Sequence, residues 1–197
     1  MLAGEFKRQL RRIGPAEFVE RRLFDEHAWC FPTQSGDDYD SFRRLFGEVL
    51  KVSAGDVAVV GSAKYGYSLA PAKNFRPFQP DDEMPEPSDI DLVVVSRAMF
   101  NSTWHNLRRA DYNGAVDARR FFQEDIFRRF VMIGTNDTLD TKYLSDLNVL
   151  LNALRKRATT RLGIVQDIKM RIYCSWVDAK AYHIWSLQRL GEKHGIQ

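Results

Sequence analysis

The chain has 197 residues, enough for one domain with a sizeable buried core. Hydrophobic residues make up 44% of it and aromatic residues 12%, which excludes a disordered chain, and its apolar runs are far shorter than the roughly 20 residues that cross a bilayer. A net charge of +3 is too small to indicate nucleic-acid binding by itself.

Arginines recur in neighbouring pairs, and most of these pairs have acidic neighbours. The simplest interpretation places them on solvated helix faces, and the alternative is a basic groove for a nucleotide or for RNA. The pairs are Arg11–Arg12, Arg21–Arg22, Arg43–Arg44, Arg108–Arg109, Arg119–Arg120 and Arg128–Arg129.

The basic N-terminus is followed by no apolar segment with a small-residue cleavage site, which predicts a cytoplasmic protein without a secretory signal. Cys30 and Cys174 lie far apart and outside any metal-ligand spacing, so we expect buried thiols rather than a disulfide. The four histidines show no ligand spacing, and we expect the four tryptophans in the core or at an interface.

The first 52 residues predict a helical N-terminal extension. Pro15 opens a helix over residues 16–29, which the turn after Phe31 ends. A second helix, over residues 38–52, carries one apolar stripe suited to packing on a sheet. This stripe consists of Phe42, Leu45, Phe46, Val49 and Leu50.

A strand, a turn and a helix are predicted next. Residues 57–60 form a short apolar run that leads into Gly61, as in a buried strand that turns into a helix. Residues 70–87 then carry five prolines and an acidic run, which predicts an exposed loop. A β-branched strand follows over residues 89–95.

The remainder of the chain predicts helices with one more strand. Residues 97–129 are mainly helical with a break at Asn113 and Gly114, and residues 141–157 form a clearer helix. Residues 167–173 alternate polar and apolar side chains, which indicates a strand with one face in the core. A last helix, over residues 177–190, completes a single domain.

Asp89 and Asp91 are the first candidates for chemistry. They are two residues apart on a predicted strand, so both side chains project from one face with α-carbons about 6.6 Å apart. Such carboxylates repel unless a proton or a cation neutralises them, and hard oxygen ligands suit Mg²⁺, with Mn²⁺ as the alternative. A third carboxylate would allow two ions about 3.5 to 4 Å apart, and Asp167 is our candidate because it begins the polar face of the strand over 167–173.

The turn at Gly61 and Ser62 is the second candidate. A helix that starts there directs unpaired backbone N–H groups at an anion, Gly61 lets the backbone approach closely, and the Ser62 hydroxyl can donate to a phosphate oxygen. Lys64 in the first helical turn either adds a phosphate contact or faces solvent. Lys169 and Arg171 either meet phosphate charge or form the solvent face of an edge strand.

The residues VVGSAKYG followed by SDIDLVVV resemble the polymerase-beta nucleotidyltransferase superfamily, whose pattern is a Gly-Ser turn followed by an Asp-x-Asp strand. The resemblance covers roughly residues 56–96. It implies an α+β fold with a small mixed sheet flanked by helices, and metal-dependent transfer of a nucleoside monophosphate from ATP or another NTP. It also implies Gly61 and Ser62 as the phosphate-binding pair, with Asp89, Asp91 and Asp167 as metal ligands.

This chain departs from the family pattern in the insertion over 70–87, which lengthens the gap between turn and carboxylates and predicts a lid or a loop that binds a partner protein. The sequence does not determine whether the acceptor hydroxyl belongs to a protein, an RNA or a small molecule. By analogy, compact members of the family resemble those that modify a macromolecule, including toxin–antitoxin and phage-defence proteins. Two alternatives stand beside an active enzyme: an inactive nucleotide sensor or partner-binding subunit, and an RNA-binding protein with a vestigial nucleotide site.

Overall fold

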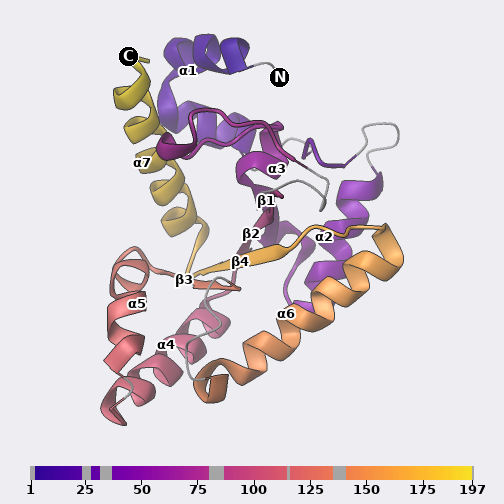
Figure 1. Cartoon of the computed structure of the whole chain (residues 1–197), viewed down its shortest axis with the longest axis vertical. Coiled ribbons are helices and arrows are strands. Elements are labelled where there is room, and N and C mark those ends of the chain that lie inside the picture. Colours follow the sequence, from indigo (N-terminus) through magenta and orange to yellow (C-terminus); the bar gives the residue numbers. More distant parts are fainter. Residues whose placement is uncertain are drawn as a thin grey trace.

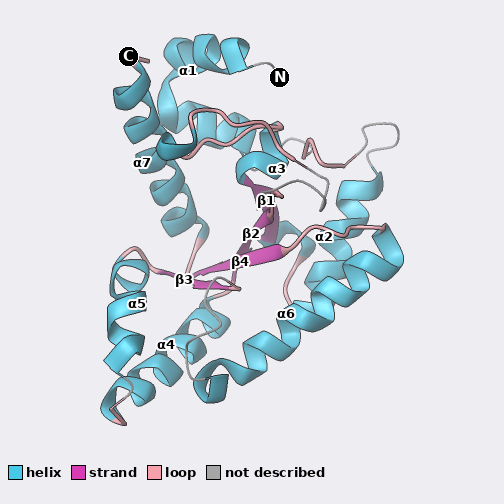
Figure 2. Ribbon diagram, in the orientation of Figure 1, coloured by secondary structure: helices cyan, strands magenta, loops and turns pink. Residues whose placement is uncertain are grey.

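The computed structural model describes residues 3–23, 28–31, 37–79, 87–114, 116–134 and 141–196. In these ranges a four-stranded mixed sheet has helices on both of its faces (Figures 1 and 2). The strands are β1 (Val57–Val60), β2 (Ile90–Val95), β3 (Phe130–Ile133) and β4 (Ile168–Tyr173). The expected α+β class with a small mixed sheet flanked by helices is confirmed.

The strand order of the sheet is β1-β2-β4-β3. β1 runs antiparallel to β2, β4 runs parallel to β2, and β3 runs antiparallel to β4. Asp91 on β2 therefore lies between Val60 on β1 and Lys169 on β4. Asp91 on β2 and Asp89 just before it therefore lie beside β4, which carries Lys169 and Arg171.

One face of the sheet packs on three helices, α2 (Asp37–Leu50), α4 (Arg97–Tyr112) and α6 (Thr141–Leu162). Its strands contribute β-branched and other apolar side chains such as Leu92 and Met170, which are fully buried. The apolar stripe predicted for residues 38–52 lies in this core, with Val49 only partly buried.

The opposite face is covered by α1 (Ala3–Phe18), the π-helical segment η1 (Val19–Leu23) and α7 (Trp176–His194), with the short α3 (Gly61–Tyr65) at its edge (Figure 1). Side chains alternate along a strand, so Val93 and Tyr173 pack on this face while their neighbours pack on the other. Asp91 lies two residues before Val93 on β2, and Lys169 and Arg171 lie four and two residues before Tyr173 on β4. Their side chains therefore project from the same face of the sheet, toward α7.

Four elements differ from the sequence prediction. A helix begins at Pro15 as predicted, because Gly14 (φ 75°, ψ 165°) breaks α1 just before it, but this helix continues as the π-helical η1 to Leu23, residues 24–27 lie outside the described part, and residues 28–29 are not helical. β3 was not predicted, because its four apolar residues directly follow α5 (Val116–Phe127) and are too few to show a period. α6 and α7 are longer than predicted.

The insertion over 70–87 is described up to Gln79 and again from Pro87. It contains a 3-10 helix, η3 (Pro71–Lys73), and its two flanks meet where Ser88 N–H donates to the Gln79 carbonyl at 2.9 Å. The predicted acidic run falls on residues outside the described part. In that part no helix combines the length and apolar character needed to cross a membrane. Both cysteines are free thiols as expected, but only Cys174 is buried and Cys30 is partly buried.

Candidate functional site

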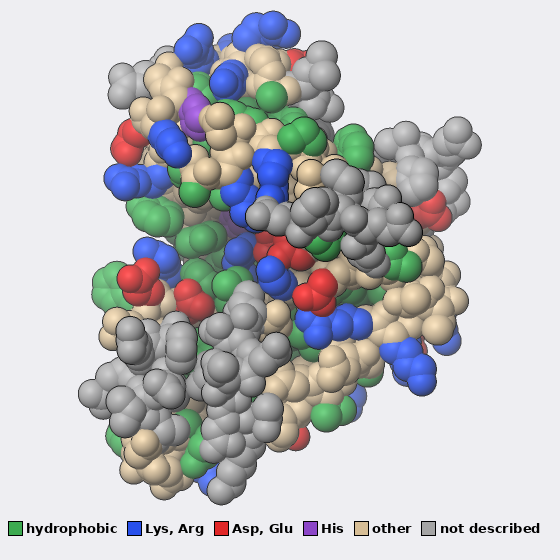
Figure 3. All heavy atoms as spheres, viewed as in Figure 1, with side chains coloured by type: hydrophobic (Ala, Val, Ile, Leu, Met, Phe, Trp, Pro, Cys, Tyr) green, Lys and Arg blue, Asp and Glu red, His purple; other side chains and the backbone are tan. Residues whose placement is uncertain are grey.

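A cavity of about 330 Å³ opens between α7 and the ends of β1, β2 and β4. We call it the central cavity. In Figure 3 carboxylates flanked by basic side chains lie in the hollow near the middle of the molecule. Six of its lining residues were predicted from the sequence, namely Gly61, Ser62, Asp89, Asp91, Lys169 and Arg171.

Gly61 lies against the carboxylate of Asp91. Its φ of +67° is in the left-handed region, and a Cβ atom on it would lie 2.9 Å from Oδ2 of Asp91. Any side chain there would be both strained and in collision, so only glycine lets β1 turn this closely beside β2. The helix that follows, α3, has only five residues, so an anion bound here would depend on the first N–H groups and the Ser62 hydroxyl rather than on a long helix dipole.

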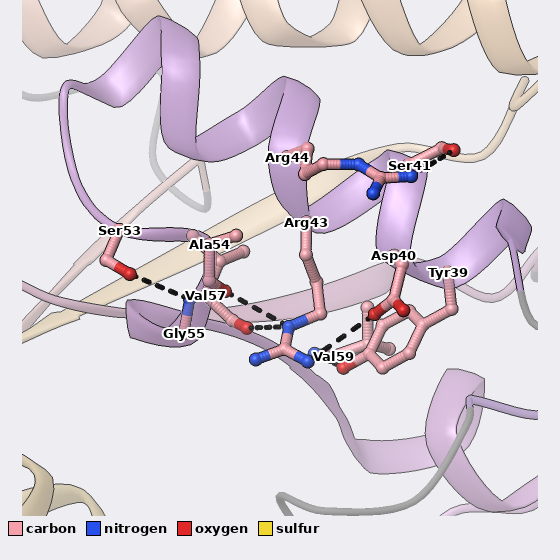
Figure 4. A network of polar contacts seen from close by, with 10 residues as sticks. All are labelled: Tyr39, Asp40, Ser41, Arg43, Arg44, Ser53, Ala54, Gly55, Val57 and Val59. Atoms are coloured by element: carbon pink, nitrogen blue, oxygen red, sulfur yellow. Dashed lines mark hydrogen bonds and ion pairs between the residues drawn. The ribbon is translucent and has the colours of Figure 1, made fainter.

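Helix α2 fixes the edge strand that delivers this turn (Figure 4). The Tyr39 hydroxyl accepts a hydrogen bond from Val59 N–H at 2.9 Å, and Arg43 Nε donates to the carbonyls of Val57 at 3.0 Å and Ala54 at 3.1 Å. The bonds to Val57 and Val59 satisfy backbone groups on the outer edge of β1, which no neighbouring strand reaches, and the bond to Ala54 ties the 3-10 turn before β1 (Ala54–Asp56) to α2. α2 therefore positions Gly61 without touching the cavity.

Each carboxylate of the Asp-x-Asp pair has a cation from β4 as its partner. Lys169 Nζ forms an ion pair with Asp89, and Arg171 Nη2 lies 3.4 Å from Asp91 Oδ1. Burial raises the pKa of Asp91 and the charge of Asp89 adds to the increase, while Arg171 opposes it. Two negative charges on one strand are thus balanced by two positive charges on the next.

Asp167 does not line the central cavity. Its carboxylate accepts from Ile168 N–H at 2.9 Å and pairs with Arg155 Nη2 of α6 at 2.7 Å. It lines a separate groove with Asp89 and Arg155 instead. Because its charge is taken up by Arg155, the structure does not bring Asp167 together with Asp91 as the three-carboxylate set expected from the sequence.

Lys64 also lies away from the cavity. Its side chain is only 3% exposed, and its ammonium lies 5.6 Å from the ring centroid of Tyr39. The contact is a cation–π interaction within the core formed by α2 and α3. Lys64 therefore does not face solvent, and it is not among the residues that line the central cavity.

Several lining residues had no signal in the sequence. Lys73 enters the cavity from η3 of the insertion, and its charge lowers the pKa of Asp91 as a minor effect. His183 and Ser186 enter from α7. Burial, with a smaller effect of Arg171, lowers the pKa of His183 to about 3, so its imidazole is neutral near pH 7. The remaining lining residues are Leu23, Val60, Ser68, Leu69, Ala70, Met132, Tyr182 and Leu187.

The donor set is suited to one divalent ion. Mg²⁺ commonly binds one or two carboxylates together with phosphate oxygens and water, and Asp89 and Asp91 supply two carboxylates in one cavity. Within the described ranges no group of three or more His, Cys, Asp or Glu side chains is placed to hold a metal ion, so no further ligands for a second ion are seen there. To bind the ion, the carboxylate of Asp89 would have to give up its ion pair with Lys169.

Comparisons with protein-family models, with curated proteins and with solved structures give no significant match to this chain.

Proposed function

We propose that the chain is a nucleotidyltransferase of the polymerase-beta type, which binds an NTP with Mg²⁺ in the central cavity and transfers its nucleoside monophosphate to a hydroxyl. The observation that carries the proposal is the contact of Gly61 with Asp91, because it places the Gly-Ser turn and the Asp-x-Asp strand on one cavity. Neither motif alone is specific, and their meeting in space is the stronger argument.

The lining residues divide into two roles. The Ser62 hydroxyl and the backbone N–H groups of the turn would bind phosphate oxygens, and Lys73, Lys169 and Arg171 would balance the charge of the triphosphate. Asp89 and Asp91 would hold Mg²⁺, which when bound neutralises the triphosphate and orients it. The acceptor oxygen forms a bond to the α-phosphorus, the bond to the pyrophosphate oxygen breaks, and the hydroxyl proton passes to solvent.

A second candidate function is NTP binding without transfer. It is favoured by the two ion pairs, since Lys169 and Arg171 already neutralise Asp89 and Asp91 and could take the place of a metal ion. In that case the triphosphate would contact Lys73, Ser62 and the β4 cations, and the carboxylates would serve to hold these cations in position. The protein would then report nucleotide levels or present a nucleotide-dependent surface to a partner subunit.

Incubation with each α-³²P-labelled NTP and Mg²⁺ tests the first function, with pyrophosphate release as a readout that needs no known acceptor. Asp89→Asn with Asp91→Asn should abolish both label transfer and pyrophosphate release. Glu48→Gln is the matched control, because this exposed carboxylate belongs to α2 on the opposite face of the sheet. Equal pyrophosphate release from the wild type and the double variant would exclude the proposed reaction.

Calorimetry separates the two functions. A transferase should bind a non-hydrolysable NTP analogue more tightly with Mg²⁺ than with EDTA, and this difference should vanish in the double variant. A binding protein of the second kind should bind the analogue equally well in EDTA and lose affinity on Lys169→Met or Arg171→Met.

A further inference from the structure

One side of α7 carries a stripe of aromatic, hydroxyl and basic side chains. Tyr182, Trp185, Ser186, Arg189 and Lys193 follow one another at helical spacing and therefore lie on one face of the helix. Two surface hollows border this stripe in addition to the central cavity. We call the stripe and the two hollows the α7 surface.

The α7 surface is continuous with the central cavity. Tyr182 lines the cavity and both hollows, and Ser186 and Ala70 line the cavity and the first hollow. The first hollow continues along α7 past Trp185 to Arg189 and Lys193, while the second lies between α7 and the end of α5. A linear ligand on this surface would thus have one end beside Ser62 and the carboxylates.

Large aromatic rings are exposed along this path. Phe127 is 88% exposed and Trp185 is 43% exposed, although burial of such rings would be favourable. The guanidinium of Arg128 lies 4.7 Å from the ring centroid of Trp185, and Tyr182 lies 5.9 Å from the same ring system. The guanidinium therefore lies over the indole, and the exposed part of this ring suits contact with another planar group.

The charge of the surface is positive. The two hollows are lined by four cations, Arg128, Arg129, Arg189 and Lys193, and by two carboxylates, Asp178 and Glu192. Three of the cations have carboxylate partners: Arg128 pairs with Glu124 at 3.4 Å, Arg129 with Asp178 at 3.2 Å and Arg189 with Glu192 at 3.4 Å. At least one side chain of each pair is more than half exposed, so water and salt screen these pairs. Lys193 donates to the Pro71 carbonyl at 2.6 Å. In Figure 3 basic and hydrophobic side chains gather together over α7 and toward α5.

We infer that the α7 surface binds single-stranded nucleic acid. Bases stack on Trp185 and Phe127, since every base offers a flat face, and the backbone phosphates contact Arg128, Arg189 and Lys193. The cations that line both hollows beside the rings favour a polyanion over an uncharged protein segment. Binding does not require catalysis. If the proposed function holds, on which this last step rests, a terminal hydroxyl of the bound strand is the acceptor of the nucleoside monophosphate.

Fluorescence anisotropy without NTP tests the inference, with labelled single strands of about 12 nucleotides as the probes. RNA and DNA of the same sequence form separate arms, because both offer bases and phosphates, and the duplex form is a third arm. Saturable binding of at least one single strand, several-fold tighter than of the duplex, is expected. Its affinity should fall with salt at a logarithmic slope of about −2, as for release of counterions by three phosphate contacts.

Trp185→Ala should weaken binding at least about fivefold, the lower limit for losing one stacked base. Trp185→Phe should retain most of the affinity because it retains a ring. Tyr112→Ser is the control, since Tyr112 is 76% exposed on α4, away from the α7 surface. Circular dichroism of each variant establishes that it is folded.

Equal affinity of the wild type and Trp185→Ala would overturn the inference, as would the absence of saturable binding. Self-association in sedimentation, lost on Trp185→Ala and without any binding of oligonucleotides, would instead make this a surface between copies of the chain. Strand binding with pyrophosphate release but without NMP transfer to the strand would overturn only the assignment of the strand as acceptor, whereas strand binding without pyrophosphate release would overturn the proposed function alone.

Discussion

Gly61 and Asp91 approach so closely that a Cβ atom on the glycine would lie 2.9 Å from Oδ2 of the aspartate. Gly61→Ala should therefore destabilise the chain and remove nucleotide binding. The left-handed φ of +67° alone costs an alanine about 1 to 2 kcal/mol, and the contact with Asp91 adds to this by displacing the carboxylate from Arg171. Urea unfolding and NTP titration measure the two effects.

Gly163→Ala is the matched control for this substitution. Gly163 has the same φ of +67°, but nothing lies within 4 Å of the Cβ atom that it would gain. It should lose only the backbone contribution of about 1 to 2 kcal/mol and should bind NTP as the wild type does. Should both alanine variants bind equally, the contact between Gly61 and Asp91 has no part in the site.

The pair of Asp91 and Arg171 should be strongly coupled. Both side chains are largely buried, with 22% and 19% exposed, so Arg171→Met leaves Asp91 in a poorly hydrated place without its cation and should cost about 2 kcal/mol. Asp91→Asn in the same chain should recover part of that loss, giving a coupling free energy of about 1 to 2 kcal/mol in a urea double-mutant cycle.

Arg21 and Glu17 provide the control cycle. Their atoms are closer, at 2.7 Å, but their side chains are 67% and 44% exposed. Solvent and salt screen such a pair, so its coupling should be below about 1 kcal/mol. A coupling at Asp91 and Arg171 as small as this would mean that water reaches their ion pair freely.

The residues that sequence alone predicted are those whose signal is local. Gly61 and Ser62 end an apolar run, and the two-residue spacing of Asp89 and Asp91 fixes their common face whatever the rest of the fold is. Their convergence on one cavity follows from the antiparallel register of β1 and β2. The α+β class was predictable for the same reason, since it needs only the types of the elements.

The partners of these residues depend on contacts that no local pattern contains. Lys169 and Arg171 were expected to face phosphate or solvent, but their ion pairs with the carboxylates follow from β4 lying parallel to β2. Lys73 comes from a proline-rich insertion and His183 from the last helix, each far along the chain from the motif. Asp167 has the predicted strand position, and Arg155 of α6 determines its role.

Asp167→Asn should have little effect on the proposed site. The carboxylate is 53% exposed and its pairing with Arg155 is worth below about 1 kcal/mol in such surroundings. Mg²⁺-dependent NTP binding, measured by calorimetry, should stay within twofold of the wild type, whereas Asp89→Asn should remove the dependence on Mg²⁺. Loss of that dependence in Asp167→Asn would restore Asp167 as a metal ligand and imply that it moves into the cavity.

His183 should make the fold sensitive to mild acid. Burial, assisted by the charge of Arg171, lowers the pKa of its imidazole from 6.5 to about 3 in the folded chain. Between these values the unfolded chain takes up a proton that the folded chain does not, so stability is complete above about pH 6.5 and falls as the pH decreases toward 3. The slope from this one group is at most about 1.4 kcal/mol per pH unit.

His183→Gln removes the titrating group and should make the dependence of the unfolding free energy on pH shallower by about that slope between pH 6 and pH 4. Other carboxylates and histidines contribute equally to both chains, so they cancel in the difference between the two curves. Urea unfolding at a series of pH values gives these curves, after circular dichroism at pH 7 has shown the native helix content. Parallel curves would mean that the His183 ring takes up its proton inside the folded chain, as it would if water filled the cavity beside Arg171.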